Sequence, residues 1–125
     1  MDGRTIYVNE GYRATNQIFT VNVDRGIVGM VTQLKASVSV SRDDDSRVLL
    51  ITYSDPKTPS TVFTVPSIAL IANRTAWRQL TDANPQVRNF ALGKEEEITW
   101  KSKDGKTVGG VLVKPVGYRA GQRYP

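Results

Sequence analysis

Short runs in which apolar and polar residues alternate recur along the whole chain, and this pattern constrains the fold more than any other feature. Residues 17–23 (QIFTVNV) place Phe19, Val21 and Val23 on one side of an extended chain, and residues 36–41 (ASVSVS) alternate strictly. Alternation with a period of two is typical of a half-buried β-strand. No segment shows the apolar period of about 3.6 residues that marks an amphipathic helix. We therefore predict an all-β chain with antiparallel sheets.

Turn and loop signals divide the rest of the chain into short elements. Further strands are predicted at residues 5–8, 27–34, 47–53, 61–65 and 77–80, turns at residues 24–26 and 42–46, and loops at residues 9–16 and 54–60. Residues 68–72 (IALIA) fit either a strand or one helical turn. Glycine, proline, asparagine and aspartate in the connecting segments support these divisions, because they favour the backbone conformations of tight turns.

The N-terminal part of the chain contains an internal repeat. The sequence QIFTV at residues 17–21 resembles TVFTV at residues 61–65, and Phe19 and Phe63 are separated by about 44 residues. A period of about 40–50 residues with about four short strands per unit is typical of β-propeller blades. We therefore predict that residues 1–80 form C-terminal blades of a propeller. The alternative is a chance match between two β-rich segments.

The C-terminal part has the pattern of a β-hairpin. Asp104 and Gly105 lie between two β-rich runs, and an Asp-Gly pair is a strong hairpin signal because both residues tolerate a positive φ. Residues 81–94 are predicted to be a linker, and residues 95–125 a hairpin that opens a further, truncated domain. We expect that domain to continue beyond Pro125.

Composition excludes several classes of chemistry. The 125 residues are enough for one domain, and they include no cysteine and no histidine. Disulfides, thiolate chemistry, Ser-His-Asp triads and histidine-ligated metal sites are therefore excluded within this chain. No apolar run approaches the ~20 residues of a membrane span, so no membrane partner is expected. The lack of cysteine favours the cytoplasm and leaves the periplasm open.

The net charge of +5 raises the question of a nucleic-acid partner. Lys and Arg are scattered from Arg4 to Arg123 and do not form a run, and aromatic residues do not interleave with them as they do in a stacking platform. We therefore expect no nucleic-acid partner. The interpretation we favour is an ordinary basic surface.

Two acidic runs and a glycine pair are candidates for chemistry. The acidic runs are Asp43, Asp44 and Asp45, and Glu95, Glu96 and Glu97. Calcium loops space their ligands at alternate positions and add a turn glycine and a bidentate glutamate, so a solvated turn fits the first run better. The second run fits a polar strand end better than a pair of catalytic carboxylates. Gly109 and Gly110 lie within a predicted strand, which indicates a bulge or a close backbone approach.

Two tryptophans, Trp77 and Trp100, are predicted to be core residues. From its own residues, the chain is predicted to contain no catalytic, cofactor-binding or metal-binding residue and to need no cofactor.

The C-terminal stretch resembles the junction between the propeller and the catalytic domain in serine peptidases of the prolyl oligopeptidase family, in the acylaminoacyl-peptidase and dipeptidyl-peptidase branch. The resemblance covers most of the chain and is specific for about 28 residues at its end. The residues that carry it are Gln79-Leu80-Thr81-Asp82 with Asn84, Glu97-Ile98-Thr99-Trp100, Asp104-Gly105, Val108-Gly109-Gly110-Val111-Leu112, Lys114-Pro115 and Gly121-Gln122-Arg123-Tyr124-Pro125.

This resemblance implies that the chain is a non-catalytic fragment of a larger serine peptidase. The parent would hydrolyse short peptides through an acyl-enzyme, the propeller would limit access to its active site, and the C-terminal hairpin would begin an α/β-hydrolase domain. No catalytic residue can be carried over, because the triad lies beyond Pro125 in that family. The alternative is a self-contained β-rich module that binds a protein or a glycan. In either case, exposed strand edges favour a homo-oligomer.

Overall fold

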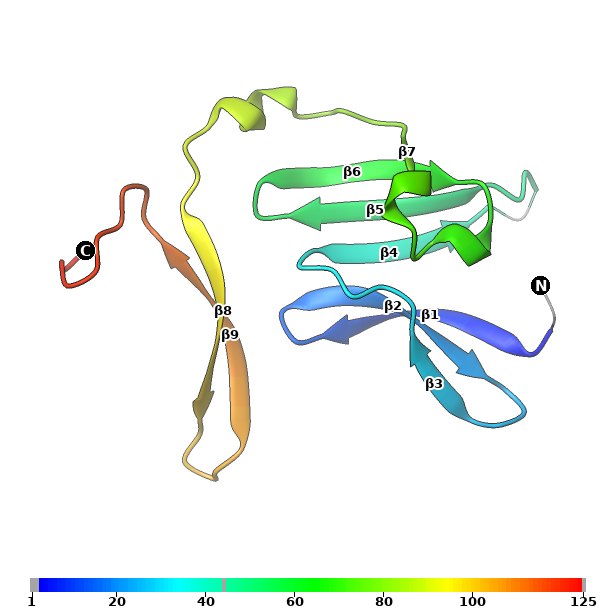
Figure 1. Ribbon diagram of the computed structural model, residues 1–125, viewed down its shortest axis with the longest axis horizontal. Coiled ribbons are helices and arrows are strands. Elements are labelled where there is room, and N and C mark those ends of the chain that lie inside the picture. Colours follow the sequence, from blue (N-terminus) through cyan, green and yellow to red (C-terminus); the bar gives the residue numbers. More distant parts are fainter. Residues whose placement is uncertain (1–2, 44, 125) are drawn as a thin grey trace.

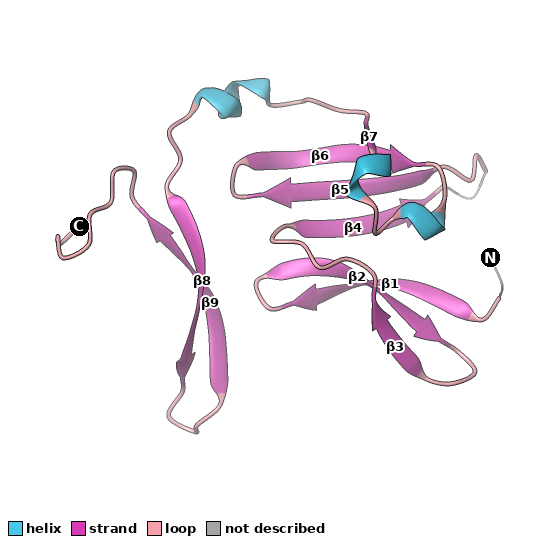
Figure 2. Cartoon of the chain, in the orientation of Figure 1, coloured by secondary structure: helices cyan, strands magenta, loops and turns pink. Residues whose placement is uncertain are grey.

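The computed structural model describes residues 3–43 and 45–124. Within these residues the chain forms nine β-strands and three short 3₁₀ helices, and neighbouring strands are antiparallel (Figure 1 and Figure 2). This confirms the prediction of an all-β chain with antiparallel sheets. None of the helices in this part of the chain is long and apolar enough to cross a membrane.

The first sheet has three strands in the order β1-β2-β3. These are β1 (Thr5–Tyr12), β2 (Thr15–Asn22) and β3 (Ile27–Met30). The loop predicted at residues 9–16 is wrong, because both strands continue to the pair formed by Tyr12 and Thr15. Arg13 and Ala14 alone reverse the chain, and Arg13 has a φ of 54°. Polar residues fill the ends of both strands because most of these positions are exposed.

The second sheet has four strands in the order β4-β5-β6-β7. These are β4 (Ser37–Arg42), β5 (Leu49–Asp55), β6 (Thr58–Val65) and β7 (Arg78–Gln79). The loop predicted at residues 54–60 is also wrong, because only Pro56 and Lys57 separate two paired strands. The Asp55 carboxylate accepts the backbone N–H groups of Lys57 at 2.8 Å and Thr58 at 2.7 Å. Aspartate followed by proline is a frequent start of such a tight turn.

Side chains of the first sheet bond to the backbone that leads into and along β4. Gln17 is 1% exposed and donates to the carbonyl oxygens of Leu34 at 2.9 Å and Ala36 at 2.8 Å. The Asn9 side chain donates to the Val40 carbonyl oxygen at 2.9 Å and accepts from the Val40 N–H at 2.8 Å. These bonds satisfy polar backbone groups along the edge strand of the second sheet. They join the two sheets side by side (Figure 1).

The hydrophobic core lies between the second sheet and the segment that follows β6. Its buried members are Ile18, Val38, Leu49, Ile51, Phe63, Val65, Ile71 and Trp77. Ile18 belongs to β2, so the two sheets share this core. The segment contains η1 (Ile68–Leu70), which confirms the helical-turn alternative, and η2 (Arg74–Ala76). The Trp77 indole N–H donates to the Ile71 carbonyl oxygen at 3.0 Å, which confirms Trp77 as a core residue.

The C-terminal part forms the predicted hairpin, which stands apart from the two sheets (Figure 1). Its strands are β8 (Lys94–Lys101) and β9 (Thr107–Lys114), and η3 (Pro85–Asn89) lies in the connection before them. Gly105 has a φ of 79°, as the Asp-Gly turn requires. Trp100 is 48% exposed, so its predicted place in the core is wrong. Its ring lies over Gly110 instead, and the strand pairing shows no bulge there.

The internal repeat corresponds to similar strands in the two sheets. An offset of about 44 residues places β1 and β2 over β5 and β6, while β4 has no counterpart among the described residues of the first sheet. The sheets thus have three and four strands rather than two equal units. A propeller blade is therefore not shown, and neither is the start of an α/β-hydrolase domain. Pro125, where that domain was expected to continue, lies outside the described residues.

Candidate functional site

Neither acidic run forms a cation site in the described part of the chain. Asp43 accepts hydrogen bonds from the N–H and hydroxyl of Ser46, which hold the pKa of Asp43 below its usual value. Asp44 lies outside the described residues. Among residues 3–43 and 45–124, no group of three or more metal-ligating side chains is placed to hold a metal ion. Asp43 therefore acts as a hydrogen-bond acceptor within the connection between β4 and β5.

Two carboxylates of the second acidic run, Glu96 and Glu97, lie near cations. Glu96 lies 2.6 Å from the Lys114 ammonium and 2.9 Å from that of Lys94, and these two hydrogen bonds lower the pKa of Glu96 to about 2. Glu97 lies 3.9 Å from the Arg13 guanidinium. A carboxylate held this firmly in its ionised form is a poor proton donor or acceptor near neutral pH. The arrangement fits a structural role better than acid-base catalysis.

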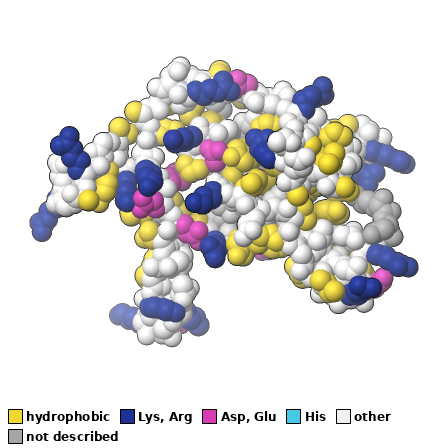
Figure 3. Space-filling model, in the orientation of Figure 1, with side chains coloured by type: hydrophobic (Ala, Val, Ile, Leu, Met, Phe, Trp, Pro, Cys, Tyr) yellow, Lys and Arg dark blue, Asp and Glu magenta, His cyan; other side chains and the backbone are white. Residues whose placement is uncertain are grey.

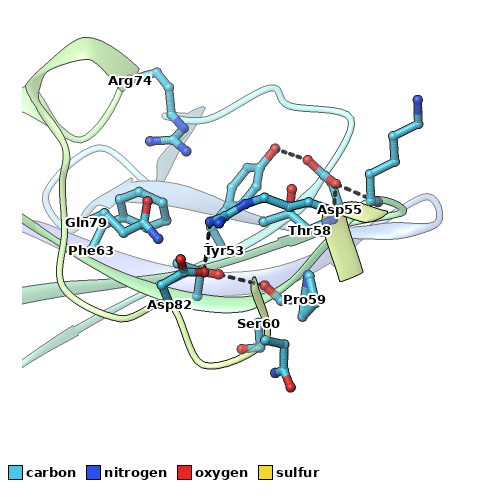
Figure 4. A pocket seen from close by; sticks show the side chains of 13 residues that line it. Tyr53, Asp55, Thr58, Pro59, Ser60, Phe63, Arg74, Gln79 and Asp82 are labelled. Atoms are coloured by element: carbon cyan, nitrogen blue, oxygen red, sulfur yellow. Dashed lines mark hydrogen bonds and ion pairs between the residues drawn. The ribbon is translucent and has the colours of Figure 1, made fainter. Parts of the chain in front are cut away.

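A pocket of about 400 Å³ lies at the end of the second sheet where β5 turns into β6. We call it the Arg74 pocket. It is lined by Tyr53, Asp55, Lys57, Thr58, Pro59, Ser60, Thr61, Phe63, Arg74, Gln79, Asp82, Asn84 and Arg88. Figure 4 shows the Arg74 side chain reaching over it from the segment that follows β6, with the Tyr53 hydroxyl directed at Asp55. The pocket thus combines aromatic rings with charged groups from three separate segments.

Arg74 lies over a cluster of three aromatic rings. Its guanidinium carbon is 4.3 Å from the ring centre of Phe63, 4.5 Å from that of Trp77 and 4.8 Å from that of Tyr53. The three rings contact one another at centroid distances from 5.8 to 6.3 Å. The Asn73 side chain caps η2 by accepting the N–H of Thr75, which fixes the backbone at the base of Arg74. A cation over ring faces is attracted by the aromatic quadrupole, by about 0.5–2 kcal/mol.

Tyr53 and Asp55 form a hydrogen-bonded pair on the β5 side of the pocket. The Tyr53 hydroxyl donates to the Asp55 carboxylate at 2.6 Å. Burial, reinforced by this hydrogen bond and by the Asp55 charge, raises the pKa of Tyr53 to about 12. Burial also acts to raise the pKa of Asp55, but the hydrogen bonds from Tyr53 and from the turn outweigh it and leave that pKa lowered. At neutral pH, Tyr53 is therefore neutral and Asp55 is charged.

The pocket combines hydroxyl groups with charged and aromatic side chains. Ser60 and Thr61 supply hydroxyls, but the chain has no histidine or cysteine to act as a base or a nucleophile. Its lining places a stacked guanidinium beside hydroxyl and amide groups and further charged side chains of both signs. Such a combination of apolar surface with a few placed polar groups is typical of ligand sites.

A second hollow, of about 980 Å³, separates the β8–β9 hairpin from the two sheets. Figure 3 shows the hairpin projecting from the body of the molecule beside this cleft. Arg13 and Glu97 form an ion pair across it at 3.9 Å, with side chains that are 65% and 39% exposed. An exposed pair of this kind contributes about 0–1 kcal/mol. The cleft is therefore bridged by only a weak contact at this point.

The sequence did not reveal the Arg74 pocket. Its residues come from positions 53–63, 74–79 and 82–88, and no spacing rule connects these segments. The one local signal is the Asp-Pro pair at the β5–β6 turn, which predicts a tight turn and hence paired strands on either side. The position of Arg74 over the rings depends on how the segment after β6 folds back on the sheet.

Comparison with known proteins identifies a structural likeness to an isopeptidase. The chain is similar to AtxE2 isopeptidase in a variant with Astexin3-dC4 bound, with a TM-score of 0.66, 20% sequence identity and 97% of this chain covered. It is also similar to the apo form of AtxE2 isopeptidase, with a TM-score of 0.63, 21% identity and 97% coverage. The chain spans 18% of the length of each of these structures. At this level of identity, the likeness shows the fold alone.

No family model matches the chain. No curated protein matches it either. The prolyl oligopeptidase assignment, together with its propeller and acylaminoacyl-peptidase function, is corrected accordingly, because two solved structures that match the chain are of AtxE2 isopeptidase. The physical reason is that Asp-Gly turns, glycine pairs and Lys-Pro strand ends satisfy the needs of many antiparallel hairpins. Their order along about 28 residues was not specific enough to indicate a family.

Proposed function

We propose that this chain is a peptide-binding, β-sheet part of an isopeptidase-like protein. The observation that carries the proposal is the likeness to AtxE2 isopeptidase, which extends over 97% of this chain. One of those structures has Astexin3-dC4 bound. The chain corresponds to 18% of the length of that protein, and we assign to it a share in peptide binding.

The residues that line the Arg74 pocket support a role of this chain in peptide binding. A peptide presents backbone amides, apolar side chains and carboxylates, and the pocket offers hydroxyls, aromatic rings and a guanidinium for these groups. The tight β5–β6 turn and the capped η2 hold the two sides of the pocket on regular elements. Binding groups fixed in this way lose little conformational freedom when a ligand arrives.

Titration of the 125-residue chain with Astexin3-dC4 tests the proposal. Trp77 lies beneath Arg74 in the core, so a ligand at the pocket should change its fluorescence. Trp100→Phe removes the signal of the hairpin tryptophan, and Trp77 is then the one tryptophan in the chain. We expect a saturable change in emission, matched by heat in calorimetry. A chain that is folded by circular dichroism but gives neither signal would contradict the proposal.

Two sequence-based expectations accompany this proposal as predictions. One is the division into residues 1–80, a linker at residues 81–94 and residues 95–125. Limited proteolysis checks it, because the first cut should fall in the linker. The other is self-association through strand edges, which light scattering measures. Val28 on β3 is 64% exposed and Val113 on β9 is 61% exposed, so both edges offer apolar surface.

A further inference from the structure

Among the described residues that line the Arg74 pocket, cationic side chains outnumber carboxylates. Its cations are Lys57, Arg74 and Arg88, and its carboxylates are Asp55 and Asp82. Asp82 is paired with Arg88, whose guanidinium nitrogen lies 2.8 Å from its carboxylate oxygen. Both oxygens of Asp55 are occupied, one by the Tyr53 hydroxyl and the other by two backbone N–H groups.

Within residues 3–43 and 45–124, Arg74 remains as the central cation without an ion-pair partner. Among the described residues no carboxylate forms an ion pair with Arg74, and none of their hydrogen bonds uses its side-chain N–H groups. Lys57 likewise has no ion-pair partner in this part of the chain. The pocket therefore presents the unpaired positive charges of Arg74 and Lys57. The two carboxylates in its lining, Asp55 and Asp82, already accept hydrogen bonds from other groups.

The stacking of Arg74 determines which part of the guanidinium a ligand can reach. The ring faces of Phe63, Trp77 and Tyr53 occupy positions within 4.8 Å of its central carbon. Ring faces attract the cation but do not replace the in-plane acceptors that its five N–H groups need. A planar carboxylate meets this requirement, because it accepts two parallel N–H bonds from a guanidinium. Tyr53 stays neutral at neutral pH and adds no repulsion.

We propose that the Arg74 pocket binds a carboxylate group of a peptide ligand, with Arg74 as the main contact and Lys57 as a second cation. The proposal rests on the peptide-binding function above and names the chemical group that this function recognises. The carboxylate can belong to an acidic side chain or to a peptide C-terminus. Both sources present the same two oxygens to Arg74.

Three short peptides of equal length separate these sources. The first is amide-capped and carries one aspartate, the second has a free C-terminus and no acidic side chain, and the third is amide-capped and neutral. Each is titrated into the full chain carrying Trp100→Phe, with Trp77 emission and calorimetry as readouts. Hydrogen bonds to charged groups contribute about 1.5–3 kcal/mol, so we expect one or both acidic peptides to bind about 10- to 100-fold more tightly than the neutral one. Whichever of the two acidic peptides binds more tightly shows whether the recognised carboxylate belongs to a side chain or to a C-terminus.

Variants of the pocket test the residues themselves. Arg74→Gln should remove the preference for the acidic peptides, and Arg74→Lys should keep part of it, because lysine retains the charge and loses the paired donors. Lys57→Gln should reduce the preference by a smaller factor. Arg25→Gln is the matched control, since Arg25 lies in the β2–β3 turn and its loss changes the net charge equally. Circular dichroism and the thermal midpoint establish that each variant is folded.

The outcomes distinguish the carboxylate proposal from the peptide-binding function. Equal affinity for acidic and neutral peptides, unchanged in Arg74→Gln, would overturn the carboxylate proposal and leave peptide binding intact. Arg74-dependent binding of the acidic peptides without any binding of Astexin3-dC4 would support the carboxylate site and contradict the link to an isopeptidase-like ligand. An equal loss of affinity in Arg25→Gln and Arg74→Gln would also overturn the site, because it would show a general charge effect.

Discussion

The side-chain amide of Gln17 donates a hydrogen bond of 2.8 Å to the carbonyl oxygen of Ala36, in a position where Gln17 is 1% exposed. The same amide nitrogen lies 2.9 Å from the Leu34 carbonyl oxygen, and the amide oxygen accepts the Leu34 N–H at 3.2 Å. One buried side chain thus serves the backbone that passes from the first sheet to the second. The joint between the sheets depends on this polar contact as well as on the apolar core.

Gln17→Met tests that joint. Methionine has a similar length but cannot donate, so the Leu34 and Ala36 carbonyl groups would lose the Gln17 donor in a buried place. We expect the free energy of unfolding to fall by about 1–3 kcal/mol, measured by urea denaturation. Gln33→Met makes the same change at an exposed position and should have little effect. Equal effects of the two variants would contradict a special role of Gln17.

The two tryptophans should differ sharply in their contribution to stability. Trp77→Ala removes a core side chain that is 8% exposed and its hydrogen bond to Ile71, so we expect a loss of about 3–5 kcal/mol or of cooperative unfolding altogether. Trp100→Ala removes a cross-strand contact on an exposed hairpin and should cost about 1 kcal/mol or less. Thermal unfolding followed by circular dichroism measures both. A larger loss of stability in Trp100→Ala than in Trp77→Ala would show that the hairpin contributes to the core.

The glycine pair of β9 provides a matched test of hairpin packing. A Cβ at Gly110 would lie 2.9 Å from Cζ3 of Trp100, whereas nothing lies within 4 Å of a Cβ at Gly109. Gly110→Ala should therefore displace the Trp100 ring and destabilise the hairpin by about 1 kcal/mol or less, because the ring is half exposed and can move. Gly109→Ala should be neutral or stabilise by about 0.4–1 kcal/mol, because it restricts the unfolded chain. The emission of Trp100 in a Trp77→Phe background reports the displacement, and an unchanged spectrum in Gly110→Ala would contradict it.

Tyr53 should titrate later than an ordinary tyrosine. Its pKa is raised from the usual 10.0 to about 12. Because the folded-state pKa is the higher one, the stability that this group contributes is fully present below pH 10 and is lost as the pH rises through about 12. Phenolate absorbance against pH should show one late transition, which disappears in Tyr53→Phe. Asp55→Asn removes the neighbouring charge and should move the transition to lower pH, and a midpoint that does not move would argue against the Tyr53–Asp55 contact.

Local patterns predicted most strands but misplaced their ends. Residues 9–16 were expected to be a loop because they are polar, yet Asn9 and Asn16 are exposed strand positions. Polarity indicates exposure, and an exposed strand end has the same composition as a loop. The Asp-Gly turn was located correctly because Gly105 meets a local backbone requirement, a positive φ, that few residues satisfy.

The sequence by itself determined the all-β class, the antiparallel hairpins and the absence of histidine and cysteine chemistry, because alternation, turn residues and composition act locally. Only the tertiary structure decided that Trp77 is core while Trp100 is exposed, and that Arg74 lies over Tyr53 and Phe63. These relationships join residues from separate strands and loops. They follow from how the segment after β6 packs on the second sheet, and no periodicity within a single strand encodes that packing.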